Sequence, residues 1–287
     1  MTPIIYTWPN GRKSIAGGTR TAISLDRPWQ KEIEINPATC PFCNKPQKEV
    51  KKFSGAGGWR LLRNVFTPFR FHQLLVPSRC WDAAKLKRLG GAKMIGEALC
   101  ILSGEIQKYP NRKFIVDTHI GYSAGQNVGH LHWHLIEYSF GGQRDFMADG
   151  MRKIFSRQPE LVLSNHKSAS LSITAGVGGV RAGQCFFIPK KPISIKANLR
   201  TLPDFLAREL YAVMSMYENK FKSKQGLSPD YSLLLSFDKG SFQYAVYTPI
   251  LNNLGAFDLA AFYDAKWPVT LPWPHETTVQ YIKNSTN

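Results

Sequence analysis

Short apolar runs and one long amphipathic segment follow each other in the first half of the chain. Residues 59–66 and 71–76 are rich in aromatic and aliphatic side chains, a composition typical of two consecutive strands. From Asp82, which can cap a helix, to Tyr109, apolar residues recur at near-helical spacing. A pair of adjacent glycines near the middle predicts a break in that helix.

Two further strands complete this half, and the second half follows the same plan. Residues 113–120 and 130–138 are strand candidates, joined by a glycine-bearing loop at 121–129. The second half contains a predicted strand at 185–189, a helix at 202–221 and strands at 231–237 and 242–248. In both halves a strand ending in proline precedes the long helix, which indicates an internal duplication with a period of about 110 residues.

Chain length and turn signals indicate two lobes behind an N-terminal arm. With 287 residues, the chain is near the upper size limit of a single hydrophobic core. Turn-forming dipeptides interrupt the first 35 residues, which predicts irregular structure there. We expect an arm at 1–35, a first domain at 36–157 and a second domain at 158–287.

Composition excludes two classes of protein. Hydrophobic residues make up 43% of the chain, too many for a disordered protein. No run approaches the roughly 20 apolar residues of a membrane-spanning helix, and no signal-type apolar core follows the first residues. We therefore expect a soluble, cytoplasmic protein with no membrane partner. Its five cysteines are an odd count, which favours thiol or metal chemistry over a disulfide framework.

The charge balance favours an anionic partner. The chain carries 37 Lys and Arg against 20 Asp and Glu, a formal net charge of +17. Such an excess fits phosphorylated small molecules and fits nucleic acid equally well. A solvated basic surface without a partner is the third interpretation that charge alone allows.

Three alternating histidines provide the strongest chemical signal. His130, His132 and His134 follow a glycine-rich approach and share one face of the predicted strand, while the residues between them face the core. Neutral imidazole can act near pH 7 as a nucleophile, a proton carrier or a metal ligand. A surface histidine cluster or an adventitious metal site is the alternative.

A Cys-x-x-Cys segment is the second signal. Cys40 and Cys43 have the spacing that presents two thiolates to one tetrahedral zinc ion, which needs two more ligands. A redox pair is the rival interpretation, but the surrounding residues resemble a loop and not a strand running into a helix. Free buried thiols are the remaining alternative.

Together these features resemble the histidine-triad (HIT) superfamily, and the whole chain is most similar to its galactose-1-phosphate uridylyltransferase branch. The resemblance covers about residues 36–250 and is weaker in the second half. It implies an α+β fold of two HIT-like repeats, each an antiparallel sheet with a long helix packed on it, the second repeat being degenerate. It also implies a structural zinc (Zn) site formed by Cys40, Cys43, Cys80 and His130, although relatives commonly carry histidine at the position of Cys80.

The resemblance assigns roles to the remaining motif residues. His132 would attack the α-phosphorus of a nucleotide and hold the nucleotidyl group as a covalent phosphoramidate. His134 would bind or polarise the phosphate oxygens. The other residues that the resemblance places at the substrate are His119, Gly125, Gln126 and Asn127. From the residues alone, Gln126 and Asn127 can equally be turn residues, and His119 a side chain at a strand end.

Four functions follow, in the order in which we favour them. The first is a nucleotidyltransferase that moves a nucleoside monophosphate from a nucleotide-sugar or dinucleotide donor. The second is a hydrolase of dinucleoside polyphosphates or nucleotide conjugates, favoured because uridylyltransferases usually carry glutamine where this chain has His134. The third is a nucleic-acid-binding or DNA-end-processing HIT protein, and the fourth an inactive zinc-stabilised scaffold. The family often forms homodimers, which the resemblance extends to this chain.

Overall fold

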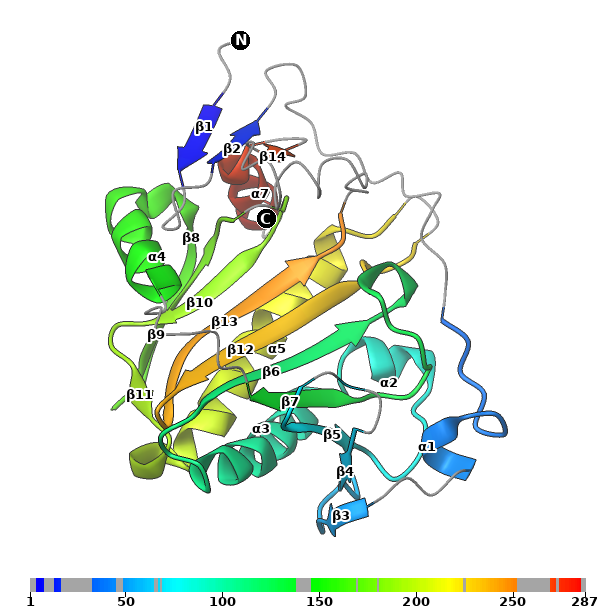
Figure 1. Ribbon diagram of the computed structural model, residues 1–287. Coiled ribbons are helices and arrows are strands. Elements are labelled where there is room, and N and C mark those ends of the chain that lie inside the picture. The colour runs from blue at the N-terminus through cyan, green and yellow to red at the C-terminus, as the bar shows by residue number, and fades with distance from the viewer. Residues whose placement is uncertain are drawn as a thin grey trace.

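A large antiparallel sheet forms the centre of the fold. The structure is a computed structural model, and it describes residues 4–7, 13–16, 33–44, 49–64, 67, 69–137, 146–168, 170–179, 181–223, 226–251, 269–271 and 274–284. The sheet has eleven strands in the order β3-β4-β5-β7-β6-β12-β13-β10-β9-β8, and β11 pairs with β13 (Figure 1). Their bounds are β3 Glu49–Lys52, β4 Arg60–Arg63, β5 His72–Val76, β6 Lys113–Ile120, β7 Trp133–Glu137, β8 Val162–Lys167, β9 Ser172–Val177, β10 Cys185–Pro189, β11 Ile193–Ser194, β12 Tyr231–Asp238 and β13 Ser241–Pro249.

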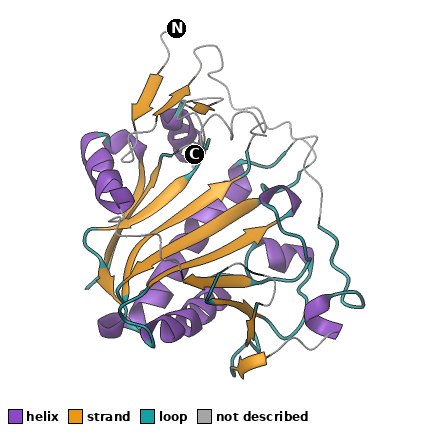
Figure 2. Cartoon of the chain, viewed as in Figure 1, coloured by secondary structure: helices purple, strands orange, loops and turns teal. Residues whose placement is uncertain are grey.

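Two long helices cover one face of this sheet. The helices are α1 Pro41–Asn44, α2 Ala83–Lys87, α3 Ala92–Gln107, α4 Phe146–Arg157, α5 Thr201–Lys220 and α7 His275–Lys283, with short 3-10 turns η1 Tyr122–Ala124, η2 Pro159–Leu161 and η3 Lys196–Asn198. Helices α3 and α5 lie side by side behind the sheet (Figures 1 and 2). They come close where a Cβ on Gly96 would lie 3.6 Å from the Cβ of Ala207. The main core lies between these helices and the sheet.

The α+β prediction is confirmed, and the break in the first helix lies where the glycine pair predicts it. Asp82 accepts a hydrogen bond from the Lys85 amide at 2.8 Å and so caps α2. Leu89, Gly90 and Gly91 then have φ angles of 50°, 74° and 89°. Three successive left-handed residues cannot continue a right-handed helix, so α3 starts afresh behind them.

Sequence patterns missed several elements and extended another too far. The polar, basic stretch after residue 138 contains α4, η2 and β8, where we predicted no element. The N-terminal arm, predicted as irregular, contains β1 Ile4–Thr7 and β2 Lys13–Ala16, which form a small sheet with β14 Val269–Leu271. The predicted strand at 130–138 begins only at Trp133.

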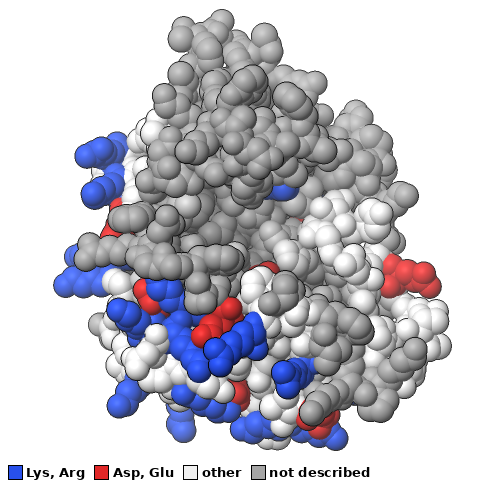
Figure 3. Space-filling view, viewed as in Figure 1, with Lys and Arg blue, Asp and Glu red and all other residues white. Residues whose placement is uncertain are grey.

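The two halves of the chain share one sheet. Strand β12 pairs with β6 in antiparallel register over eight residues, from Tyr231 opposite Ile120 to Asp238 opposite Lys113. This pairing joins the first-half strands to the second-half strands without a gap. Lys and Arg side chains gather along the left side and lower part of the face in Figure 3, near α4 and the end of the sheet at β11. Among the described helices, none combines the length and the apolar character that a membrane span requires.

Candidate functional site

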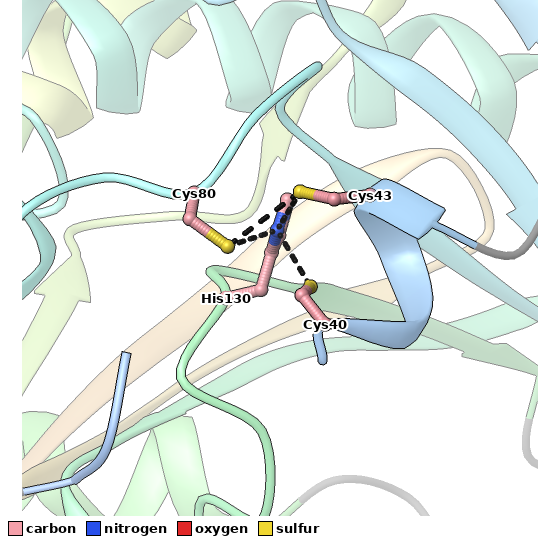
Figure 4. A group of neighbouring side chains, drawn as sticks. All are labelled: Cys40, Cys43, Cys80 and His130. Carbon is pink, nitrogen blue, oxygen red and sulfur yellow. Dashed lines mark hydrogen bonds between the residues drawn. The ribbon is translucent and has the colours of Figure 1, made fainter. Parts of the chain in front are cut away.

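Three thiols and one imidazole meet at a single point beside the sheet (Figure 4). His130 Nδ1 lies 3.4 Å from Cys40 Sγ, 3.6 Å from Cys43 Sγ and 3.2 Å from Cys80 Sγ. The Cys43 and Cys80 sulfurs are 3.6 Å apart, and all four atoms lie within 4.8 Å of one another. The structure therefore brings together the four residues that the sequence nominates as metal ligands. We call them the Cys3His cluster.

Local structure explains how separate segments reach this point. The amides of Cys43 and Asn44 donate to the Cys40 carbonyl at 3.2 and 3.0 Å, so α1 is a single turn that presents both thiols on one side. Cys80 follows β5 after Pro77, and His130 ends the loop before β7. Buried apolar side chains pack around the cluster, in which Cys40 and His130 are buried and Cys43 and Cys80 half-buried: Phe42, Leu62, Leu74 and Val76.

The donor set fits a metal ion such as zinc. His130 Nε2 donates to the Pro77 carbonyl at 3.0 Å, which leaves Nδ1 unprotonated and facing the sulfurs. Burial lowers the pKa of His130 to about 4, so the ring is neutral. Burial and the neighbouring thiols raise the pKa of the Cys80 thiol. Thiolates this close together need a cation between them, and three sulfurs with one imidazole nitrogen are a tetrahedral zinc set.

His132 is held by the backbone of the preceding motif histidine. Its Nδ1 donates to the His130 carbonyl at 2.8 Å, so Nε2 carries the free lone pair. Burial lowers the pKa of His132, which keeps the imidazole neutral. The Phe42 ring lies 5.7 Å away and packs beside it. His130 thus joins the Cys3His cluster to His132, because its ring faces the sulfurs while its carbonyl accepts the hydrogen bond from His132.

His134 contacts a histidine that the sequence analysis did not nominate. His134 Nδ1 lies 2.8 Å from Nε2 of His72 on β5, and His72 Nδ1 lies 2.7 Å from the Thr67 hydroxyl. The Thr67 oxygen already accepts from the Phe69 amide at 3.2 Å, which favours donation of its own proton to His72. Burial lowers the pKa of His134 to about 4. Asn64 Nδ2 lies 3.3 Å from both ring nitrogens of His72. With the Thr67 hydroxyl as donor to His72 and His72 Nε2 as donor to His134 Nδ1, the His134 proton is on Nε2.

A further polar pair lies on the same face of β6. His119 Nε2 is 3.4 Å from Asp117 Oδ2, and the His119 ring is 6.3 Å from the ring of His134. Asp117 is paired across the strands with His134, and its electrostatic interaction with that ring opposes the effect of burial. His119 therefore lies beside His134, and its contact with a substrate stays a prediction.

The loop residues that were predicted to contact a substrate differ in their exposure. The Gln126 side chain is buried, accepts from the Gly121 amide at 2.8 Å and donates to the Val128 carbonyl at 2.9 Å. These two hydrogen bonds hold the shape of the loop, and the side chain is buried away from the surface. Gly125 has a φ of 89°, and Asn127 is exposed beside a cavity of about 480 Å³. That cavity lies between the loop and the Cys-x-x-Cys turn.

One part of the sequence interpretation is wrong. Strict alternation predicted that all three motif histidines line one groove, but His130 lies before β7 and is fully buried among the thiols. His132 and His134 remain neighbours, with ring centroids 5.1 Å apart. His72 and Asp117 were missed because only strand pairing brings them to this face. The alternating burial of β6 was the available signal for Asp117.

Comparison of the coordinates with solved structures decides the type of fold. The X-ray structure of a GalT-like protein from Arabidopsis thaliana matches with a TM-score of 0.67 at 15% identity, covering 99% of each chain. The chain has the GalT-like fold. The structure of an ADP-glucose phosphorylase from Arabidopsis thaliana with bound ADP-glucose also matches, with a TM-score of 0.67 at 15% identity, covering 100% of the present chain and 99% of the phosphorylase. A uridylyltransferase structure matches at 0.58 and 14% identity, covering 90% and 96%.

The resemblance noted from the motif is thus confirmed at the level of fold. No protein-family model matches the sequence, and no curated protein sequence matches it. The GalT-like fold places the motif histidines, the loop and the Cys3His cluster of this chain within one region of the molecule.

Proposed function

We propose that the chain is a nucleotidyltransferase in which His132 is the nucleophile. The observation that carries this proposal is the 2.8 Å hydrogen bond from His132 Nδ1 to the His130 carbonyl. It fixes the tautomer with a lone pair on Nε2, and burial keeps the ring neutral. The proposal is supported by the GalT-like fold, since the solved structures of that fold include a phosphorylase with bound ADP-glucose and a uridylyltransferase.

The reaction would proceed by two in-line displacements. His132 Nε2 attacks the α-phosphorus, a P–N bond forms, and the bond to the bridging oxygen breaks with release of a phosphorylated leaving group. The imidazole becomes cationic but keeps its Nδ1 proton, which the His130 carbonyl stabilises. An acceptor oxygen then attacks the same phosphorus, and the P–N bond breaks to return neutral His132.

Neighbouring groups would stabilise the transferring phosphate. His134, with its Nε2 proton set by His72, would donate to a phosphate or bridging oxygen. Asn127 and the backbone amides near Gly125 would approach the phosphate from the loop. Gln126 would act through the loop conformation that its two hydrogen bonds maintain.

We further propose that Cys40, Cys43, Cys80 and His130 hold zinc. A bound ion would be structural, because all four donors of the tetrahedral set come from the protein. It would supply charge neutralisation for the thiolates and fix the His130 carbonyl that holds His132. Such a site requires reduced thiols, which agrees with the cytoplasm as its location.

The acceptor separates two versions of this activity. Transfer to phosphate or a sugar phosphate would make the chain a phosphorylase or transferase acting on a nucleotide sugar or dinucleotide. Transfer to water would make it a hydrolase, and the His72–His134 pair favours this second candidate because it offers a proton relay beside the phosphate. Both versions require the same intermediate on His132.

Product analysis tests the proposal and separates the versions. ADP-glucose, UDP-glucose and diadenosine tetraphosphate are each incubated with the full chain, alone, with inorganic phosphate or with a hexose 1-phosphate. The nucleotides and nucleotide sugars are then separated by chromatography. A nucleoside diphosphate that forms from the nucleotide sugar only with phosphate indicates phosphorolysis, and a nucleoside monophosphate that forms without phosphate indicates hydrolysis. Turnover that persists in His132→Ala, or no turnover of any donor, contradicts the proposal.

A further inference from the structure

A groove at another part of the sheet is lined by lysine and serine side chains. It encloses about 420 Å³ between the β8–β9 turn and the β10–β11 turn. Its principal polar lining residues are Lys167, Lys190, Lys191, Ser168, Ser172 and Ser194. Among the described residues, neither Asp nor Glu contributes to the lining. We call this feature the Lys-Ser groove.

Backbone pairing builds the walls of the groove. Strand β10 pairs with β9 from Cys185 opposite Val177 to Pro189 opposite Ile173, and the Lys190 amide donates to the Ser172 carbonyl at 3.3 Å. Leu171 and Ile193 are buried next to these polar residues and anchor the two turns in the core. The groove is therefore formed by sheet geometry and not by the conformation of lysine side chains alone.

No described carboxylate compensates the charges of the groove. Lys167, Lys190 and Lys191 are exposed, and none of them forms an ion pair with a residue in the described part of the chain. The neighbouring His166 instead lies 3.0 Å from the Glu209 carboxylate. Ammonium groups gathered without carboxylates repel one another, so an anion that enters the groove lowers their electrostatic free energy.

The Lys-Ser groove is separate from the motif histidines. Strand β10 lies four places from β7 in the sheet order, with β6, β12 and β13 between, which corresponds to about 19 Å at about 4.8 Å per strand. The groove also lies at the end of the sheet where β6 begins, whereas His134 pairs with Asp117 in the middle of β6. A small substrate on His132 does not reach it.

We propose that the Lys-Ser groove binds the phosphate backbone of a nucleic-acid strand. Lysine, serine and asparagine side chains are the donors that proteins use for phosphate oxygens, and Asn198 completes this set in the groove. In the part of the chain that the structure describes, no aromatic side chain lines the groove, so the contacts that these residues offer are to phosphates and carry no base preference. The +17 net charge supplies the long-range attraction that such binding uses. This site is independent of the activity proposed for His132.

Salt-dependent binding tests the proposal. The full chain is titrated into a fluorescent oligothymidylate of about 20 nucleotides, longer than the roughly 4 to 16 nucleotides that single-strand sites cover, and anisotropy is recorded over a range of NaCl concentrations. The test variant carries Lys167→Gln, Lys190→Gln and Lys191→Gln. The matched control carries Lys51→Gln, Lys85→Gln and Lys222→Gln, three exposed lysines on other elements with the same change in charge.

The groove variant and the control should differ in a measurable way. Loss of three phosphate contacts on a single strand lowers the slope of log K against log salt by about 2 and the affinity near about 0.1 M NaCl on the order of 100-fold. The control triple should change the slope by less than about 0.5. Equal losses of affinity in both variants would mean that diffuse charge binds the strand, which contradicts the proposal. An unchanged affinity in the groove variant, or no binding by the native chain, would also overturn it. Inorganic polyphosphate is a second probe: binding that depends on the groove lysines while oligothymidylate binding does not would also refute the nucleic-acid assignment.

Discussion

Loss of Cys80 tests whether the Cys3His cluster acts as a metal cross-link. Cys80→Ser keeps the size of the side chain but replaces a thiolate with a poor zinc ligand. The cross-link that it removes joins Cys43 to Cys80, which are 37 residues apart in sequence. The chain-entropy relation for a closed loop of this length gives a contribution to the free energy of unfolding of about 4 kcal/mol. At about 2 to 4 °C per kcal/mol, Tm falls by about 8 to 16 °C.

Cys100 provides the matched control for this experiment. It is an exposed free cysteine on α3, outside the cluster, so Cys100→Ser should leave Tm and metal content unchanged. Zinc per chain is measured by elemental mass spectrometry, and Tm is measured with and without a chelator. The native chain and Cys100→Ser should hold about one zinc ion and lose thermal stability with chelator, whereas Cys80→Ser should hold little zinc. A Cys80→Ser chain with full zinc and an unchanged Tm, or a native chain indifferent to chelator, would refute the cross-link.

Three further perturbations test other parts of the structure. His72→Ala should lower turnover about 100-fold while Tm changes little, because it removes the hydrogen bond that sets the tautomer of His134. Steady-state kinetics and a melting curve measure the two quantities, and unchanged turnover would contradict the proton relay. Gly121→Ala should lower the free energy of unfolding by about 2 kcal/mol, since Gly121 has a φ of 94° and a Cβ would collide with the Asp230 carboxylate. Gly104→Ala, in open space on α3, should raise it by about 0.5 kcal/mol. Denaturant unfolding measures both variants, and equal effects would contradict the argument. Burial lowers the pKa of His275 from 6.5 to about 4, so between these pH values the unfolded state binds a proton that the folded state does not. The free energy of unfolding should therefore rise by about 3 kcal/mol as pH increases from about 4 to 6.5. A rise that His275→Gln does not reduce would contradict this assignment.

Periodicity predicted those elements whose burial is regular. Residues 113–120 alternate between half-buried and buried positions along the whole of β6, and both long helices have a continuous apolar side, so their patterns were readable. The stretch containing α4 and β8 is polar and basic. Strand β8 lies at the edge of the sheet, with two of its six residues exposed and the other four half-buried. A weakly buried edge strand has no strong alternation to read.

The site was predictable where ligands are close in sequence or carried by a motif. The Cys-x-x-Cys spacing and the histidine motif named all four members of the Cys3His cluster, including Cys80, which only the family resemblance suggested. His72 could not be found in this way, because it reaches His134 through the pairing of β5 with β7, in which His72 lies opposite Ile136. Alternation also misplaced His130, since the chain becomes a strand only at Trp133. The division into two repeats near residue 157 stays a prediction.

Covalent labelling of His132 is the most direct test of the central claim. The purified chain is incubated with UDP-glucose, ADP-glucose, GDP-glucose, ATP or diadenosine tetraphosphate in the absence of an acceptor, quenched, and weighed intact by mass spectrometry beside His132→Ala. The account predicts a mass increase equal to one nucleotidyl group, located on His132 by peptide mapping and absent from the variant. Neither adduct nor turnover with any donor, or an adduct of the same size on His132→Ala, would contradict it.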